Sequence, residues 1–307
     1  LKVEMLGRRS RWVRRTLLLL AAAVAAGGMW YTVIGQRDHV QAQALGVLAN
    51  GNVRLLRELN ASWVLPEDYI LEVREVDGRV VEWVQEQDIQ PEQVILQLHG
   101  GAYIRSLADN GATYRRAAVQ YAAVSGAAVA TVDYRVAPEH PYPAALEDAV
   151  LTYRWLLDQG YQPENIIIAG DSAGGGLALA TVMYLRDNGL PLPAGLITMS
   201  AWTDLDYERW TPPYVGSHSA DNPYISPVYG DYTGFPPLLM QVGGAERMLD
   251  DTLRVARKAE AAGVCVQQTT YPGMFHVFQM LFPKLPEANE AWQEVAAFIR
   301  EVFTTEQ

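Results

Sequence analysis

Gly170-Asp171-Ser172-Ala173-Gly174-Gly175 is the most informative segment of this sequence. It follows an apolar run at 165–169 and opens a helix-like stretch at 176–185. A strand, a tight turn and a helix form the context in which Gly-x-Ser-x-Gly holds a serine in a strained, outward-facing position, because small residues let the backbone turn sharply. Ser172 is therefore the candidate nucleophile.

The segments around this turn alternate between strands and helices. Strands are predicted at 93–98, 127–132, 165–169, 195–199, 237–242 and 264–271, and helices at 113–124, 144–159, 176–185, 250–262 and 287–302. This alternation predicts an α/β fold with a mostly parallel central sheet covered by helices on both faces. Two further strands at 69–76 and 79–84, joined by Asp77-Gly78, predict a leading antiparallel hairpin with a type I′ turn.

Between Trp202 and Tyr224 the periodic pattern is lost. Aromatic residues, prolines, glycines and acidic residues alternate there without a helical or strand period. Such a composition is typical of a loop, and its position places it at the carboxyl side of the sheet, where open α/β sheets bind ligands.

Charge and cysteine content exclude several classes of protein. The 307-residue chain carries a net charge of −11, which argues against a nucleic-acid partner because phosphate binding needs clustered lysine and arginine. The single cysteine, Cys265, excludes an intramolecular disulfide and a cysteine-based metal cage. Its apolar neighbours predict a buried strand residue rather than a reactive thiol.

The N-terminal segment has a composition of its own. Five arginines between positions 8 and 15 precede an uncharged stretch at 16–35, which is the layout of a signal peptide or membrane anchor. Residues 42–44, Ala-Gln-Ala, suit a cleavage site. Export or membrane association through residues 16–35 is therefore favoured over a cytoplasmic protein whose soluble N-terminal helix lies over the active site. A short amphipathic helix is predicted at 52–63.

A serine nucleophile needs a base, and the base needs an orienting carboxylate. Of the five histidines, only His276 follows the last predicted strand, where a loop can bring it to Ser172. The acid should follow the strand that ends near residue 242, where Glu246, Asp250 and Asp251 compete. Glu246 is favoured because the two aspartates suit the beginning of the next helix.

Backbone N–H groups should stabilise the negative charge that develops on an attacked carbonyl. Gly100 and Gly101 can bring their loop close to the substrate, and Ala173 begins the helix after the turn. These three residues are the predicted oxyanion hole, although a plain strand-ending turn explains the glycine pair as well. The predicted pocket walls are Tyr103, Trp202, Phe275 and Val277, which flank the catalytic loops and could equally belong to the core.

In these motifs the chain closely resembles the hormone-sensitive-lipase-like esterases, bacterial family IV of the α/β-hydrolases. The matching pieces are His99-Gly100-Gly101-Ala102-Tyr103, the stretch from Asp133 to Asp148, Gly170 through Gly175, Ser226 to Asp231, Gly234 to Pro237, and Val242 to Asp251. Two departures concern the site. Ala102 replaces a third glycine, and the segment between Trp202 and Ser226 is shorter than is usual in the family.

The resemblance implies an α/β-hydrolase fold with an N-terminal helical cap, no cofactor, and carboxylesterase activity on short- to medium-chain acyl esters. It assigns Ser172, Glu246 and His276 to the triad, and Gly100, Gly101 and Ala173 to the oxyanion hole. The expected division is an N-terminal segment at 1–64 and a catalytic domain at 65–307.

Other functions stay open beside this one. One alternative is a catalytically silent receptor for a small hydrophobic ligand, and another is an amidase or lactonase that uses the same machinery. The sequence leaves the physiological ester and a homodimer undecided.

Overall fold

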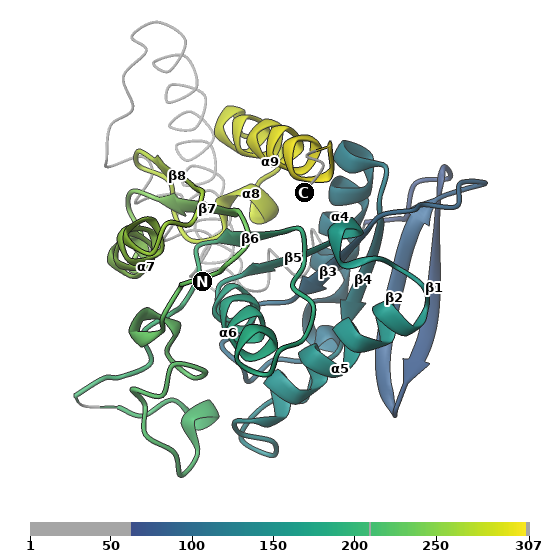
Figure 1. Cartoon of the computed structure of the whole chain (residues 1–307). Coiled ribbons are helices and arrows are strands. Elements are labelled where there is room, and N and C mark those ends of the chain that lie inside the picture. The colour runs from purple at the N-terminus through teal and green to yellow at the C-terminus, as the bar shows by residue number, and fades with distance from the viewer. Residues whose placement is uncertain (1–62, 209, 305–307) are drawn as a thin grey trace, which may run out of the picture.

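The computed structural model describes residues 63–208 and 210–304, which form an eight-stranded sheet with helices on both faces (Figure 1). The strands are β1 (Tyr69–Val76), β2 (Arg79–Glu86), β3 (Val94–Leu98), β4 (Ala128–Val132), β5 (Ile166–Asp171), β6 (Gly195–Met199), β7 (Leu238–Gly243) and β8 (Val266–Tyr271). The helices are α4 (Leu107–Ser125), α5 (Ala144–Asp158), α6 (Ala173–Asp187), α7 (Leu249–Ala261), α8 (Phe278–Leu281) and α9 (Pro286–Thr304).

The strand order is β1-β2-β4-β3-β5-β6-β7-β8. β1 pairs antiparallel with β2, and β2 pairs antiparallel with β4, whereas every pairing from β4 to β8 is parallel. Asp77 and Gly78 both have positive φ, as a type I′ turn requires. The predicted mostly parallel sheet with a leading hairpin is confirmed.

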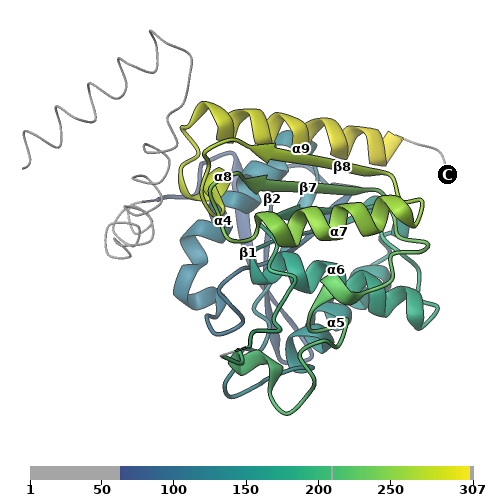
Figure 2. The same cartoon turned by 90° about the vertical axis from the view of Figure 1, so that its left-hand side faces the viewer.

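β5 lies inside the sheet, between β3 and β6, and it is buried along its whole length. Ile166 and Ile168 pack into a core with α5, α6 and α7, while Ile167 and Ala169 pack into a second core with α4 and α9. Figure 2 shows α7 and α9 on opposite sides of the strands. Burying one such isoleucine stabilises the fold by about 1.5–3 kcal/mol, so both cores hold β5 and the turn that follows it.

Cys265 contradicts the prediction of a buried strand residue, because its side chain is exposed. The residue immediately precedes β8, an edge strand whose residues are mostly only partly buried. Its carbonyl still accepts the N–H of Leu238 at 2.9 Å. Its apolar neighbours Val264 and Val266 pack into or against the core, while the Cys265 side chain between them points outward.

Several predictions for the N-terminal segment lie outside the described residues. They are the membrane or signal segment at 16–35, the cleavage site at 42–44, the amphipathic helix at 52–63 and the helical cap. Within 63–208 and 210–304, no helix combines the length and the apolar character needed to cross a membrane. The division at residue 64 stays a prediction.

Candidate active site

Ser172 occupies the turn between β5 and α6. Its φ of 52° and ψ of −120° are strained for a residue with a side chain. The end of β6 helps to hold this conformation, because Ser172 N–H donates to the Met199 carbonyl at 2.9 Å and Ser172 C=O accepts the Trp202 N–H at 2.8 Å. The serine is therefore presented at the carboxyl edge of the sheet by contacts with the neighbouring strand.

Close backbone packing explains the glycines on either side of Ser172. A Cβ at Gly170 would collide with the carbonyl of Gly174, and a Cβ at Gly174 would collide with the carbonyl of Leu98. Glycine is required at these two positions because α6 begins directly against the ends of β3 and β5. The Gly-x-Ser-x-Gly pattern thus reflects the close approach of three backbone segments.

The structure brings Ser172, His276 and Glu246 into one hydrogen-bonded chain. His276 Nε2 lies 2.9 Å from Ser172 Oγ, and His276 Nδ1 lies 2.6 Å from Glu246 Oε2. Glu246 follows β7 and His276 follows β8, so the two residues reach Ser172 from successive strands of the sheet. The carboxylate makes the Nδ1–H, Nε2-acceptor tautomer the favoured one, which leaves Nε2 able to take the serine proton.

The two aspartates that competed with Glu246 lie elsewhere. Asp251 Oδ2 accepts the backbone N–H groups of Thr203 and Asp204, each at 3.0 Å. Burial raises the pKa of Asp251 to about 6. Asp250 is exposed in the first turn of α7. Of the three candidates, Glu246 is the one in contact with His276.

Ser200 supports the Glu246 carboxylate and was missed by the sequence reasoning. Its hydroxyl donates to Glu246 Oε1 at 2.7 Å and accepts the N–H of Val277 at 3.0 Å. The N–H of Gly243 also donates to Glu246 Oε1, at 2.6 Å. Ser200 thereby connects the acid to the loop that carries the histidine. Its place directly after β6 was the available signal, because that position also lies at the carboxyl edge of the sheet.

The predicted oxyanion hole needs one correction. The Gly100 N–H is already engaged, since it donates to Tyr114 Oη at 2.8 Å and to Asp171 Oδ1 at 3.1 Å. Within the described part of the chain, the N–H groups of Gly101, Ala102 and Ala173 have no hydrogen-bond acceptor. Ala102 lines the same pocket as Ser172. The donors available to a substrate on this loop are therefore those of Gly101 and Ala102 rather than that of Gly100.

Buried polar groups hold this loop in place. The His99 ring stacks on Tyr134 with centroids 4.0 Å apart, and its Nδ1 lies 2.8 Å from the Gly100 carbonyl. Burial lowers the pKa of His99 to about 4, so the ring is neutral and Nδ1–H is the donor. Burial also raises the pKa of Asp171 to about 6 against the opposing effects of His276 and of its hydrogen bonds. These groups serve the loop and lie outside the Ser172–His276–Glu246 chain.

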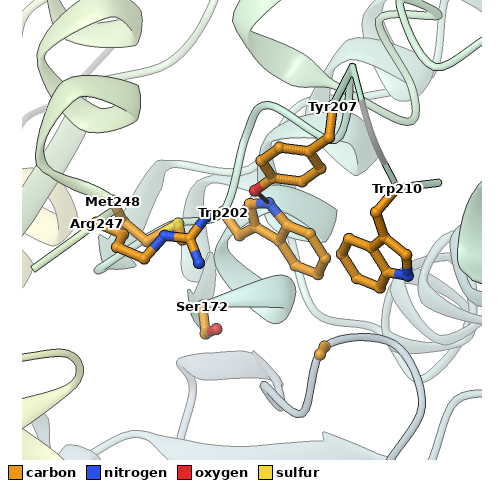
Figure 3. Close-up of a pocket in the computed structure, with 7 residues that line it drawn as sticks. Ser172, Trp202, Tyr207, Trp210, Arg247 and Met248 are labelled. Atoms are coloured by element: carbon orange, nitrogen blue, oxygen red, sulfur yellow. Dashed lines mark hydrogen bonds between the residues drawn. The ribbon is translucent and has the colours of Figure 1, made fainter. Parts of the chain in front are cut away.

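A pocket of about 440 Å³ opens over Ser172 (Figure 3). The residues that line it are Ala102, Ser172, Trp202, Tyr207, Trp210, Arg247 and Met248. Trp202 was predicted as a wall. The sequence reasoning missed Tyr207, Trp210, Arg247 and Met248, although the first two lie in the irregular segment that it placed beside the site.

The other three predicted walls belong to the core. Tyr103 is 1% exposed and stacks on Tyr214 with centroids 3.7 Å apart. Phe275 packs in a buried cluster with Phe278, and Val277 packs with the helices α4 and α9. Their backbones flank the catalytic loops, but their side chains turn into the protein interior, which a position in the sequence does not reveal.

Comparison with known proteins agrees with this architecture. A family model of the alpha/beta hydrolase fold matches residues 95–280. An acetyl-hydrolase of Streptomyces hygroscopicus is 39% identical over 71% of this chain and 79% of its own length. An esterase of Acinetobacter venetianus is 37% identical over 67% of this chain and 74% of its own.

Solved structures give the same result. The crystal structure of an esterase from the bacterial hormone-sensitive lipase family superposes with a TM-score of 0.74 at 36% identity, covering 83% of this chain and 92% of that one. The esterase EstE5, soaked with p-nitrophenyl butyrate, gives a TM-score of 0.71 at 35% identity over 82% and 98% of the two chains.

The chain therefore belongs to the α/β-hydrolase family. Within it, the chain groups with the bacterial hormone-sensitive-lipase esterases and is a carboxylic ester hydrolase. The resemblance drawn from the motifs is confirmed at this level.

Proposed function

We propose that the protein hydrolyses short- to medium-chain acyl esters through a Ser172–His276–Glu246 triad and an acyl-enzyme intermediate. The observation that carries the proposal is the continuous hydrogen-bond chain from Ser172 Oγ through both imidazole nitrogens to Glu246. A serine hydroxyl becomes a useful nucleophile when a positioned base accepts its proton, and this chain provides that base and its orienting group.

In the first step, Ser172 Oγ attacks the ester carbonyl while His276 Nε2 takes the hydroxyl proton. The imidazolium keeps its Nδ1–H bonded to Glu246, whose other oxygen is held by Ser200 and Gly243. The carbonyl oxygen becomes an oxyanion, which the N–H groups of Gly101, Ala102 and Ala173 would stabilise. The second carboxylate oxygen is fully engaged, so Glu246 needs little reorganisation when the charge on His276 appears.

Collapse of the tetrahedral intermediate expels the alcohol, which receives its proton from His276 Nε2. A water molecule then attacks the acyl-enzyme, with His276 again as base. The same oxyanion donors serve the second intermediate, and its collapse returns the proton to Ser172 Oγ and releases the carboxylic acid.

Two observations support a short to medium acyl chain. The pocket over Ser172 has a volume of about 440 Å³, which lies toward the lower end of the roughly 300–1,000 Å³ range of small-molecule sites. Among the relatives, one is named an acetyl-hydrolase, and EstE5 was soaked with a four-carbon ester.

The test is turnover of a p-nitrophenyl ester series from acetyl to dodecanoyl, together with the matching p-nitroanilides. We expect turnover that peaks in the short to medium range, weak or no anilide cleavage, and a loss of about 10³-fold or more in Ser172→Ala. Circular dichroism would show that the variant is folded. Equal activity of Ser172→Ala, or a preference for anilides, would refute the proposal.

A further inference from the structure

Among the described residues that line the pocket over Ser172, Arg247 alone has a charged side chain. Arg247 directly precedes Met248 and α7, and Figure 3 shows its guanidinium extending toward the indole of Trp202. The rest of the wall is mainly aromatic or apolar, with Trp202, Tyr207, Trp210 and Met248. Arg247 is exposed, so a ligand that enters the pocket can reach its guanidinium.

Among the described residues, Arg247 lacks the carboxylate partner that several other arginines of the protein have. Arg254, Arg135 and Arg115 pair with Asp204, Asp148 and Glu82, respectively. Arg247 has no ion pair or hydrogen bond with any residue in the described ranges 63–208 and 210–304. Arg247 lines the pocket, and its five N–H donors have no protein acceptor in this part of the chain.

Tyr207 adds a second donor to the lining of the pocket. Its hydroxyl oxygen accepts the Trp202 indole N–H at 2.8 Å, and no described residue accepts its own proton. Burial raises the pKa of Tyr207, whereas the charge of Arg247 acts to lower it, so the two groups are electrostatically coupled. Tyr207 is accordingly a neutral O–H donor at physiological pH.

The nearby carboxylates do not neutralise these donors. Asp204 is bound to Arg254 at 2.6 Å, and Asp251 accepts the backbone N–H groups of Thr203 and Asp204. No carboxylate is among the described residues that line the pocket. The pocket thus offers a guanidinium and a phenol O–H to a ligand, while Asp251 and Asp204 act on Tyr207 electrostatically without lining the pocket.

We propose that Arg247 and Tyr207 form an anion-binding subsite that selects ester substrates carrying a carboxylate or another anionic group. This inference rests on the proposed esterase function and names its substrate class. The guanidinium matches a carboxylate in a two-pronged geometry, and the phenol supplies a further hydrogen bond. The subsite also explains why an acidic protein of net charge −11 would keep one unpaired arginine beside its nucleophile.

Two matched pairs of esters test the proposal. In the first pair, 4-acetoxybenzoate and methyl 4-acetoxybenzoate, the charge lies on the alcohol side. In the second pair, mono-4-nitrophenyl adipate and 4-nitrophenyl hexanoate, it lies on the acyl side. The readout is the ratio of kcat/KM for the charged ester to that for its neutral partner, in wild type, Arg247→Gln, Arg247→Lys and Tyr207→Phe.

We expect Arg247→Gln to lower this ratio by about tenfold or more for at least one pair, mainly through a higher KM, because it removes a charge-assisted hydrogen bond. Arg247→Lys should restore part of the ratio, and Tyr207→Phe should lower it by a smaller factor. Arg257→Gln is the matched control, since it removes the same charge from an exposed position on α7. It should leave the ratio unchanged, and high salt should weaken the effect of Arg247.

The outcomes separate this inference from the proposed function. If neutral esters are hydrolysed but Arg247→Gln leaves the charged-to-neutral ratio of kcat/KM unchanged for both pairs, the anion subsite is overturned. The proposed esterase function is then unaffected. Calorimetric binding of 4-acetoxybenzoate to Ser172→Ala, with and without Arg247→Gln, tests the subsite without turnover. Binding weakened about tenfold by loss of Arg247 supports the subsite even if no ester is hydrolysed, and equal binding overturns it.

Discussion

The nucleophile turn, residues 170–176, and the wall segment, residues 202–208 and 210, meet at the pocket over Ser172 and are built in different ways. In the nucleophile turn every residue except Ser172 is buried, and its shape comes from backbone packed on backbone. In the wall segment the side chains of Tyr207 and Trp210 face the pocket, and Trp210 is 56% exposed. The candidate nucleophile is thus positioned by close backbone packing, whereas most of the wall of the pocket is formed by side chains that are partly or largely exposed.

The two regions share one structural feature, a carboxylate that accepts hydrogen bonds from backbone N–H groups. The buried Asp171 binds that of Gly100, and the partly buried Asp251 binds those of Thr203 and Asp204. Burial raises the pKa of both carboxylates to about 6. Asp171, at the end of β5, thus binds the loop that follows β3, and Asp251, in the first turn of α7, binds the start of the wall segment.

The largest expected effect comes from breaking the backbone packing of the nucleophile turn. Gly174→Ala would push a methyl group against the Leu98 carbonyl, and we expect a loss of about 4 kcal/mol or more in the free energy of unfolding, or no folded protein. Urea denaturation measures this change in the free energy of unfolding. Gly111→Ala is the control, because its Cβ would meet its nearest neighbour only at 3.7 Å and alanine favours a helix. A folded Gly174→Ala protein with the midpoint of wild type would contradict this account of the turn.

Removing the charge that orients His276 should have the next largest effect. Glu246→Gln preserves shape but loses the carboxylate on His276 Nδ1, and we expect kcat to fall by about 10²–10⁴-fold with little change in KM. Steady-state kinetics on one neutral ester provides the measurement. Asp250→Asn, exposed in the first turn of α7, is the matched control and should change kcat by less than about threefold. The reverse result would mean that Asp250 is the acid.

Burial of the Asp171 carboxylate should make the free energy of unfolding depend on pH. Its pKa is raised from 3.8 to about 6 in the folded protein, so the folded state binds the proton more tightly than the unfolded state. The Asp171 contribution to stability is therefore fully present below about pH 4 and is lost as the pH rises through about 6, a change of about 3 kcal/mol.

Denaturant unfolding of wild type and Asp171→Asn between pH 4 and 7 isolates this contribution. The difference in unfolding free energy, wild type minus variant, should decrease with rising pH. Asp250→Asn again serves as control and should give a flat difference. A difference for Asp171→Asn that increases or stays constant would show that the carboxylate is not destabilised by burial.

The smallest effect belongs to the exposed wall. Trp210→Ala should lower kcat/KM for octanoyl or longer esters by about three- to tenfold, leave acetyl esters nearly unchanged, and alter stability by less than about 0.5 kcal/mol. The measurement is kcat/KM as a function of acyl-chain length, compared between wild type and the variant. Val73→Ala, another exposed apolar residue but on β1, should leave the profile unchanged. An equal loss of kcat/KM for all acyl-chain lengths would show that Trp210 has a structural role rather than a contact with the acyl chain.

Local patterns were sufficient for most of the fold. The 195–199 strand was predicted with the bounds of β6, and the hairpin turn at Asp77-Gly78 has the expected backbone. These features depend on residues near one another in the chain, such as alternating apolar strands and the special backbone needs of a turn. The elbow at Ser172 is recognisable for the same reason, because strand, small residues and helix are contiguous.

Side-chain direction and hydrogen-bond partners depended on distant segments. The Gly100 N–H is unavailable to a substrate because Tyr114 and Asp171 reach it from α4 and β5. Tyr103 turns inward because Tyr214 stacks on it, and Cys265 is exposed because β8 is an edge strand. None of these partners can be found by spacing along the chain.

The sequence alone therefore predicted the order of the elements, the class of enzyme and the candidate nucleophile, because each depends on short contiguous motifs. Only the tertiary structure showed that Glu246, rather than Asp250 or Asp251, contacts His276. It also showed that the Ala102 N–H is available as a donor and that Arg247 lines the pocket. The physical reason is that a parallel sheet brings the ends of β3, β5, β6, β7 and β8 to one edge. Which groups meet there is decided by how each connecting loop packs on its neighbours.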